Sequence, residues 1–228
     1  MIMAAHQPQY LPWLGYFNKM ASCDLFIYLD DVQYKKREYQ NRNKIRVKEG
    51  WQWLTVPVVS KGRFDQEIRR VEIEPGSSWS HDHWAGIRLA YGKAGAFHEH
   101  EAALAALYAQ PWTKLDAMCR GFNEWHRGAF RISTPVALSS SFAVTTQKTR
   151  RLVDLCKACG ADTYLSGQGA KEYLEPQLFT EAGIRLKFQE FRPPAYPQSH
   201  PGFEPNMAAA DLILNQGARS RDILLGSA

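Results

Sequence analysis

The chain has 228 residues, 45% of them hydrophobic, which is enough for the core of one large domain. No run approaches the roughly 18 apolar residues of a membrane-spanning helix, and no basic segment followed by an apolar one opens the chain, so we expect neither a span nor a secretory signal. Four scattered cysteines argue against a disulfide framework and predict a cytoplasmic location.

The net charge of +5 is concentrated in one segment. Seven basic residues and one acid, Glu38, lie between Lys35 and Lys48. A concentrated patch attracts anions more strongly than the same charge spread over a surface. This segment favours a small anionic partner, such as a phosphate compound, over nucleic acid, because the remaining sequence has no basic stripe. The alternative is a solvated basic loop.

The first 75 residues alternate between strand patterns and polar turns. Apolar and β-branched runs predict strands, and Pro12 followed by apolar residues at helical spacing predicts a short helix. The expected strands are residues 1–5, 25–29, 51–59 and 70–73, and the expected helix is 12–22.

The sequence of the next region, residues 77–132, predicts helices. We expect this region to be an insertion into the α/β domain. The apolar spacing predicts three helices, with Ser78 or Ser80 capping the first. They cover residues up to 94, 97–108 and 111–131.

An α/β pattern returns after a linker at 133–146. Thr145 or Thr146 can cap a helix at 148–159, and Gly160 can end it. Strands are expected at 163–165 and 185–191, with helices at 170–182 and 206–215.

These elements predict an α/β fold. We expect a mostly parallel, Rossmann-like sheet of about five strands, with a nucleotidyltransferase-like arrangement as one version of it. The domain would span residues 1–228, with 77–132 as a helical insertion. The sequence does not predict the order of the strands.

Polar side chains directly follow the first two predicted strands. Because parallel strands present their carboxyl ends at one sheet edge, where α/β proteins bind ligands, we expect a site there. His6 is the candidate general base, and Asp31 is the second candidate catalytic residue. A purely structural role is the alternative for each, and Asp30 is expected to cap the following turn or to pair with Arg42.

A larger set of polar and basic residues is expected to bind the substrate at the same place. The turn that begins at Ser166 could hold an anion on its backbone amides, although it lacks the lysine of a P-loop. The alternative is an internal polar network. The predicted substrate-binding residues are Gln7, Gln9, Tyr10, Gln33, Lys36, Gln40, Asn41, Arg42, Asn43, Lys44, Ser166, Gly167 and Gly169.

Histidine and cysteine pairs elsewhere do not predict a metal site. His81 and His83, like His98 and His100, are two residues apart, so on a helix they point to different faces. Cys156 and Cys159 lack a second pair at zinc-site spacing, so a buried helical role is favoured.

Five sequence blocks resemble the WbqC-like protein family, in the same order and over nearly the whole chain. They are HQPQYLPWLGYFNKM (6–20), DDVQYKKREYQNRNKIR (30–46), WLTVPV (53–58), TYLSGQGAKEYL (163–174) and DLILNQG (211–217). The chain departs from the family pattern at residues 206–210, where Asn-Met-Ala-Ala-Ala replaces a more apolar run that contains serine.

The resemblance implies a role in bacterial surface polysaccharide biosynthesis, including O-antigen. It implies transfer of an acyl or aminoacyl group, such as glycine, to an amino sugar, with a nucleotide-sugar as the anionic partner. A looser similarity to pantothenate-synthetase-like enzymes implies the alternative, an ATP-dependent enzyme that forms an acyl-adenylate with Mg²⁺ at Asp31. The third hypothesis for the function is a non-catalytic binding protein.

Overall fold

The computed structural model describes residues 1–226, which form two compact units. Their residue ranges interleave along the chain, and the border passes through helix α1 (Leu14–Ala21). Unit 1 comprises Met1–Gln7, Asn18–Val32 and Ser133–Arg192; unit 2 comprises Pro8–Phe17, Gln33–Ile132 and 193–226. The expected helical segment 77–132 lies inside unit 2.

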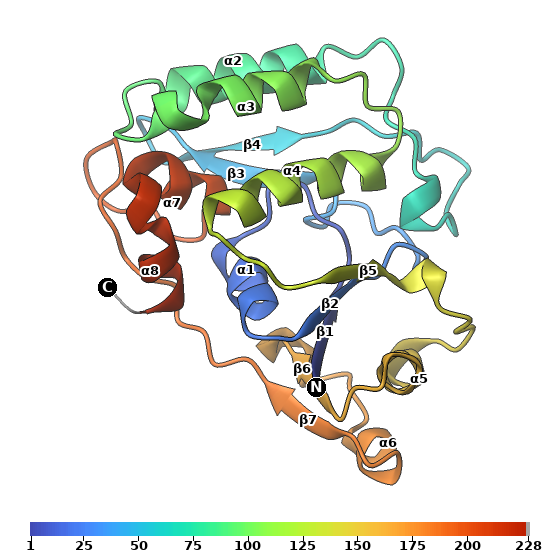
Figure 1. The fold of residues 1–228 in the computed structure, drawn as a ribbon. Helices are drawn as coiled ribbons and strands as arrows, with labels where there is room; N and C mark the ends of the chain where they lie inside the picture. The colour runs from blue at the N-terminus through green and yellow to red at the C-terminus, as the bar shows by residue number, and fades with distance from the viewer. Residues whose placement is uncertain (227–228) are drawn as a thin grey trace. The chain divides into compact units, whose positions relative to one another are not determined.

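Unit 1 is built on a five-stranded parallel sheet, which confirms the predicted α/β fold (Figure 1). Every pairing in the sheet is parallel, and the strand order is β5-β2-β1-β6-β7. Numbered along the chain within this sheet, the order is 3-2-1-4-5, as in doubly wound nucleotide-binding folds. The strands are β1 (Ile2–His6), β2 (Leu25–Tyr28), β5 (Val136–Leu138), β6 (Thr163–Ser166) and β7 (Arg185–Phe188).

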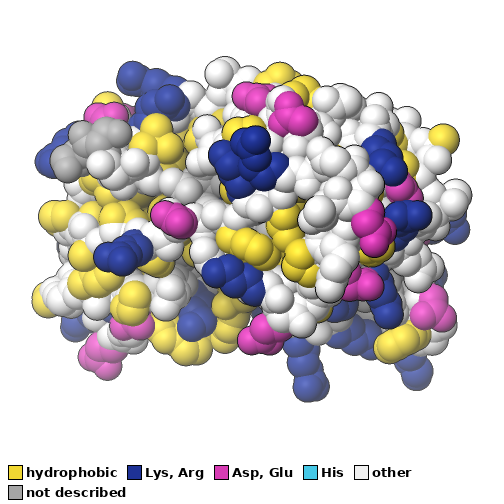
Figure 2. Space-filling model, turned by 90° about the horizontal axis from the view of Figure 1, so that it is seen from below, with side chains coloured by type: hydrophobic (Ala, Val, Ile, Leu, Met, Phe, Trp, Pro, Cys, Tyr) yellow, Lys and Arg dark blue, Asp and Glu magenta, His cyan; other side chains and the backbone are white. Residues whose placement is uncertain are grey.

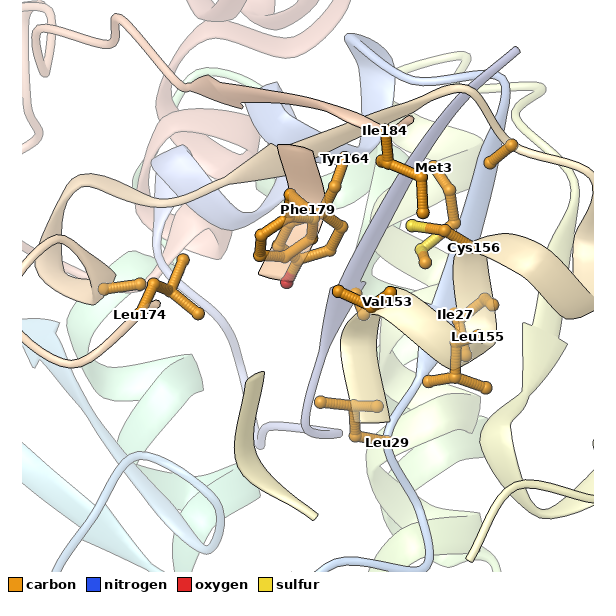
Figure 3. Packing of buried hydrophobic residues seen from close by; sticks show 13 residues of the cluster. Met3, Ile27, Leu29, Val153, Leu155, Cys156, Tyr164, Leu174, Phe179 and Ile184 are labelled. Atoms are coloured by element: carbon orange, nitrogen blue, oxygen red, sulfur yellow. The ribbon is translucent and has the colours of Figure 1, made fainter. Parts of the chain in front are cut away.

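One face of this sheet packs against helices α5 (Lys148–Cys159) and α6 (Pro176–Glu181). Figure 3 shows Met3, Val153 and Phe179 in this core, each fully buried. Because successive strand residues point to opposite faces, Met3 and Ala5 face this core while Ala4 and His6 face the other way. The pleat therefore decides which polar groups share a face at the sheet edge.

Unit 2 combines helices with a two-stranded antiparallel sheet. Strands β3 (Arg42–Arg46) and β4 (Trp51–Thr55) form a hairpin, and α2 (Trp79–Tyr91) and α3 (Phe97–Ala109) lie alongside each other (Figure 1). The other helices of the unit are α4 (Leu115–Ala129), α7 (Ala209–Gln216) and α8 (Ser220–Leu225).

Several predicted element bounds are wrong for identifiable reasons. The linker 133–146 contains β5, which is too short for an alternating pattern to mark it. The expected strand at 70–73 follows a 3₁₀ turn, Ile68–Arg70, and joins neighbours only through isolated bridges. The expected helix at 170–182 begins only at Pro176, because proline cannot continue a helix from the preceding turn and keeps Glu175 extended.

Two local predictions concern the ends of α5. Gly160 ends the helix in the left-handed conformation at φ 72°, as predicted. Gln147, rather than a threonine, occupies the capping position, and no side chain caps the helix there. Across residues 1–226, no helix combines the length and apolar character needed to cross a membrane.

Candidate functional site

The carboxyl edge of the unit-1 sheet has a topological switch point between β1 and β6. Chain connections run outward in opposite directions from these two neighbouring strands, and this is where doubly wound sheets bind ligands. The switch point is flanked by His6 and Gln7 at the end of β1 and by Ser166 and Gly167 at the end of β6.

His6 is held neutral at this edge. Its backbone carbonyl accepts a hydrogen bond from Leu29 N at 2.9 Å, which fixes the end of β1 beside β2. Burial, together with the neighbouring Lys19 ammonium, lowers the pKa of His6 to about 3. The Nδ1 atom lies 3.2 Å from the carbonyl oxygen of Gln7, which favours a proton on Nδ1 and a lone pair on Nε2. His6 is therefore a neutral imidazole at any pH near 7.

Lys19, from α1, reaches the same edge. Its Nζ donates to the Ala5 carbonyl at 3.1 Å, and the residue is only 4% exposed. Burial lowers the pKa of the ammonium to about 8, so it stays mostly charged at neutral pH. The sequence did not predict Lys19 as a site residue, because a lysine in the last turn of a short helix is ordinarily exposed.

The Ser166 turn also lies at this edge, with its side chain on the other face. Extension of the β1–β6 register pairs Ser166 with Ala5, so the serine faces the α5 side of the sheet, away from His6. The space beside Gly167 and Gly169 is open, since a Cβ at either would meet no atom within 4 Å. Gln168 Nε2 donates to the Gln189 carbonyl at 2.6 Å, which ties this turn to the end of β7.

The paired carboxylates after β2 are engaged by neighbouring polar groups. Asp30 accepts hydrogen bonds from Ser139 Oγ and from the backbone N and Oγ of Ser140, so its partners lie in the 3₁₀ turn after β5 and not in the turn that follows Asp30. Asp31 accepts from Ser139 Oγ and forms an ion pair with Arg151 Nη2 at 2.5 Å. These contacts connect β2 to the end of β5 and to α5. A catalytic role for Asp31 stays a prediction.

In unit 2, one face of the β3–β4 hairpin combines cations with aromatic rings. Lys44 Nζ lies 4.1 Å from the ring centroid of Trp51, and the Arg42 guanidinium carbon lies 4.4 Å from that of Trp53. Tyr39 lies beside Trp53, with 6.1 Å between ring centroids. Cation–π contacts of this kind hold the charged groups in fixed positions. The hairpin thus presents an ordered part of the basic segment.

The opposite face of the hairpin and the segment before it carry buried amides. Asn43 Nδ2 donates to the Leu11 carbonyl at 2.5 Å, and Asn41 Nδ2 donates to the Val56 carbonyl at 2.8 Å. Gln40 Oε1 accepts from the Lys35 backbone N at 3.0 Å. These bonds join strands and loops of unit 2, and none of the three reaches the helical segment 77–132.

The four remaining predicted binding residues of unit 2 differ in their burial and contacts. Tyr10 is fully buried, and its hydroxyl contacts His83 Nδ1 at 2.9 Å and the Tyr108 hydroxyl at 2.6 Å. Gln9 is buried as well, and its Oε1 has no hydrogen-bond partner among the described residues. Gln33 is exposed and donates to the Phe64 carbonyl at 3.1 Å, while Lys36 is exposed.

The predicted site residues therefore fall into two sets. Unit 1 holds His6, Gln7, Asp31, Ser166, Gly167 and Gly169, with His6 and Ser166 on opposite faces of its sheet. Unit 2 holds Gln9, Tyr10, Gln33, Lys36, Gln40, Asn41, Arg42, Asn43 and Lys44. Convergence of the two sets on one ligand stays a prediction.

The distribution of charged and metal-binding side chains indicates which kinds of ligand the protein could hold. On the face drawn in Figure 2, lysine and arginine side chains are scattered among acidic and apolar ones rather than gathered in one patch. Within residues 1–226, no group of three or more His, Cys, Asp or Glu side chains could hold a metal ion together. An anion bound by unit 1 would therefore depend on individual cations. Lys19 and Arg151 are both buried there, and Arg151 is already paired with Asp31.

The sheet order and the polar groups at its switch point define an α/β protein of the doubly wound class. The chain belongs to the WbqC-like protein family, which matches residues 7–223. It is 38% identical over 224 residues to "Uncharacterized protein Rv1507c" of Mycobacterium tuberculosis (strain ATCC 25618 / H37Rv), with 97% of this chain and 96% of the relative covered. No solved structure matches the chain.

Proposed function

We propose that this protein transfers an acyl or aminoacyl group, such as glycyl, to the amine of an amino sugar, free or nucleotide-linked, in bacterial surface polysaccharide biosynthesis. The observation that carries the proposal is the neutral His6 beside the buried Lys19 ammonium at the switch point. Family membership and the similarity of the sequence blocks support the choice of substrate class.

The chemistry assigned to this site balances without a redox partner. The sugar amine attacks the carbonyl carbon of an activated acyl donor, such as a thioester or an ester, so that a C–N bond forms and the bond to the leaving group breaks. His6 Nε2 accepts the proton that the amine nitrogen loses and returns it to the leaving group. A base with so low a pKa acts late, once bond formation has made the attacking nitrogen acidic.

The direct test is mass spectrometry of a nucleotide-linked amino sugar incubated with the protein and a glycyl thioester. We expect a mass gain of one glycyl group, and we expect His6→Gln to lower kcat about 100- to 10,000-fold, the usual contribution of a general base. His98→Gln, on an exposed position of α3, is the matched control and should keep full turnover. Unchanged turnover in His6→Gln would remove the proposed base.

A second candidate function is supported by the strand order alone. Sheets with the order 3-2-1-4-5 bind nucleotides at the switch point, so an enzyme that activates a carboxylate with ATP is the alternative. A ligand that binds only the folded state raises the melting temperature. Mg²⁺-dependent stabilisation by ATP, with glycine adenylated in its presence, would favour this reaction over direct transfer from an activated donor.

A further inference from the structure

Lys19 is a buried cation without a matching anion. Its Nζ carries three N–H donors, and within residues 1–226 the Ala5 carbonyl is the one acceptor at hydrogen-bond distance. No carboxylate in that range lies within 4.0 Å of this nitrogen. Two donors of a side chain that is only 4% exposed therefore remain without partners.

The ionisable neighbours of Lys19 do not compensate its charge. Burial raises the pKa of the Cys23 thiol to about 12, so this group is neutral near pH 7. His6 is neutral as well, because its pKa is lowered to about 3. A buried ammonium is costly unless it is paired and hydrogen-bonded, so an unpaired one is seldom retained for stability alone.

We infer that Lys19 binds an oxyanion of the substrate, a phosphate or a carboxylate, at the β1 end of the unit-1 sheet. The two unpartnered N–H donors match two oxygen atoms of such a group. The inference rests on the proposed function for the location of the site, and it adds the charged substrate group that this site recognises. A nucleotide-sugar offers a diphosphate, and an amino-acid donor offers a carboxylate.

The competing explanation is structural: Lys19 could simply join α1 to β1 through the Ala5 carbonyl. The two explanations predict opposite signs for Lys19→Met. If the charge is kept for a ligand, its removal eliminates an uncompensated buried ammonium, and the melting temperature of the ligand-free protein should rise by about 3–8 °C for a chain of this size. If the lysine is a structural link, the melting temperature should fall.

The experiment measures melting temperatures with increasing inorganic phosphate or UDP in one arm and acetate or glycine in the other. The wild type should be stabilised in at least one arm, and that arm identifies the oxyanion as phosphate or carboxylate. Lys19→Met should lose this stabilisation, and Lys157→Met, which removes an exposed lysine from α5, should retain it. Lack of stabilisation of the wild type in both arms, or its retention in Lys19→Met, would overturn the inference.

A second measurement covers the case in which Lys19→Met does not fold. In wild-type protein with ¹⁵N-labelled lysine, the Lys19 Nζ signal should shift on titration with the stabilising oxyanion, and an unchanged signal would overturn the inference. His6→Gln separates this inference from the proposed function. Suppose that His6→Gln binds the oxyanion, but neither this variant nor the wild type transfers an acyl group. The anion site is then supported, and the transfer proposal is wrong.

Discussion

Asp211→Ala should lower the free energy of unfolding by about 4 kcal/mol, because it leaves several buried donors without an acceptor at about 1–3 kcal/mol each. Asp211 is fully buried in unit 2. Its carboxylate accepts hydrogen bonds from the Tyr91 hydroxyl at 2.9 Å, the Tyr196 hydroxyl at 2.8 Å and Gln198 Nε2 at 2.9 Å. This network connects α2, α7 and the proline-containing segment before α7. Urea unfolding, followed by tryptophan fluorescence, measures the loss.

A double-mutant cycle tests whether the network causes the loss. Tyr196→Phe alone removes one donor and should destabilise the protein, but it should cost little when Asp211 is already alanine, because the acceptor is then gone. Equal costs of Tyr196→Phe in both backgrounds would show that the two side chains are not coupled. Asp211→Asn should fall between wild type and alanine, because it keeps one acceptor oxygen.

Acid should unfold the protein through its buried histidines. Burial lowers the pKa of His126 to about 3 and that of His83 to about 4, and His6 is lowered to about 3. Each decrease of the pKa from its usual value of 6.5 corresponds to about 3–5 kcal/mol per histidine, at about 1.4 kcal/mol per pKa unit. His126 is fully buried, its Nδ1–H donates to the Phe122 carbonyl at 2.8 Å, and its ring stacks on Phe17.

The sign follows from proton uptake. The unfolded chain binds protons at these histidines below about pH 6.5, whereas the folded protein binds them only near pH 3–4, so stability is full above pH 6.5 and is lost as the pH falls. Asp211 opposes this trend, because burial raises its pKa and its protonation favours the folded state. The three histidines together change the free energy of unfolding with pH more than the single carboxyl group of Asp211 does. Urea unfolding at pH 7.5, 6.5, 5.5 and 4.5 should show a steadily falling free energy of unfolding.

Two variants make this pH experiment specific. His126→Phe removes one buried titrating group and should flatten the dependence between pH 6.5 and 4.5, whatever its effect on stability at pH 7.5. His98→Gln, at an exposed position, leaves the buried histidines in place and should keep the wild-type slope. If His126→Phe has the same slope as the wild type, burial of that imidazole does not drive the acid effect.

The α/β class could be predicted because it depends on local patterns. β1, β2 and β6 are apolar runs next to polar turns, and α5 has helical spacing with a glycine at its end. The three-residue β5 carries no such pattern, and its place beside β2 is set by packing within the sheet. The hairpin strand β3 was missed because its outward face is basic, and basic residues mark strands poorly.

The candidate site could be predicted only in part. His6 follows a predicted strand and lies among polar residues, so the order of the elements predicted its place at the sheet edge. Lys19 was not, because a lysine on a short amphipathic helix is ordinarily exposed, and its burial follows from how α1 packs. The register between β1 and β6 could not be predicted from the sequence either. This register places the Ser166 side chain on the face of the sheet away from His6.

A chemical-shift titration of the wild-type protein with a nucleotide-linked amino sugar tests most directly whether the ligand binds at the unit-1 sheet edge. We predict that the largest changes fall on His6, Gln7, Lys19 and the 166–169 turn, all at the carboxyl edge of the unit-1 sheet. Largest changes confined to α2 and α3, with the β1 and β6 ends unaffected, would contradict this prediction.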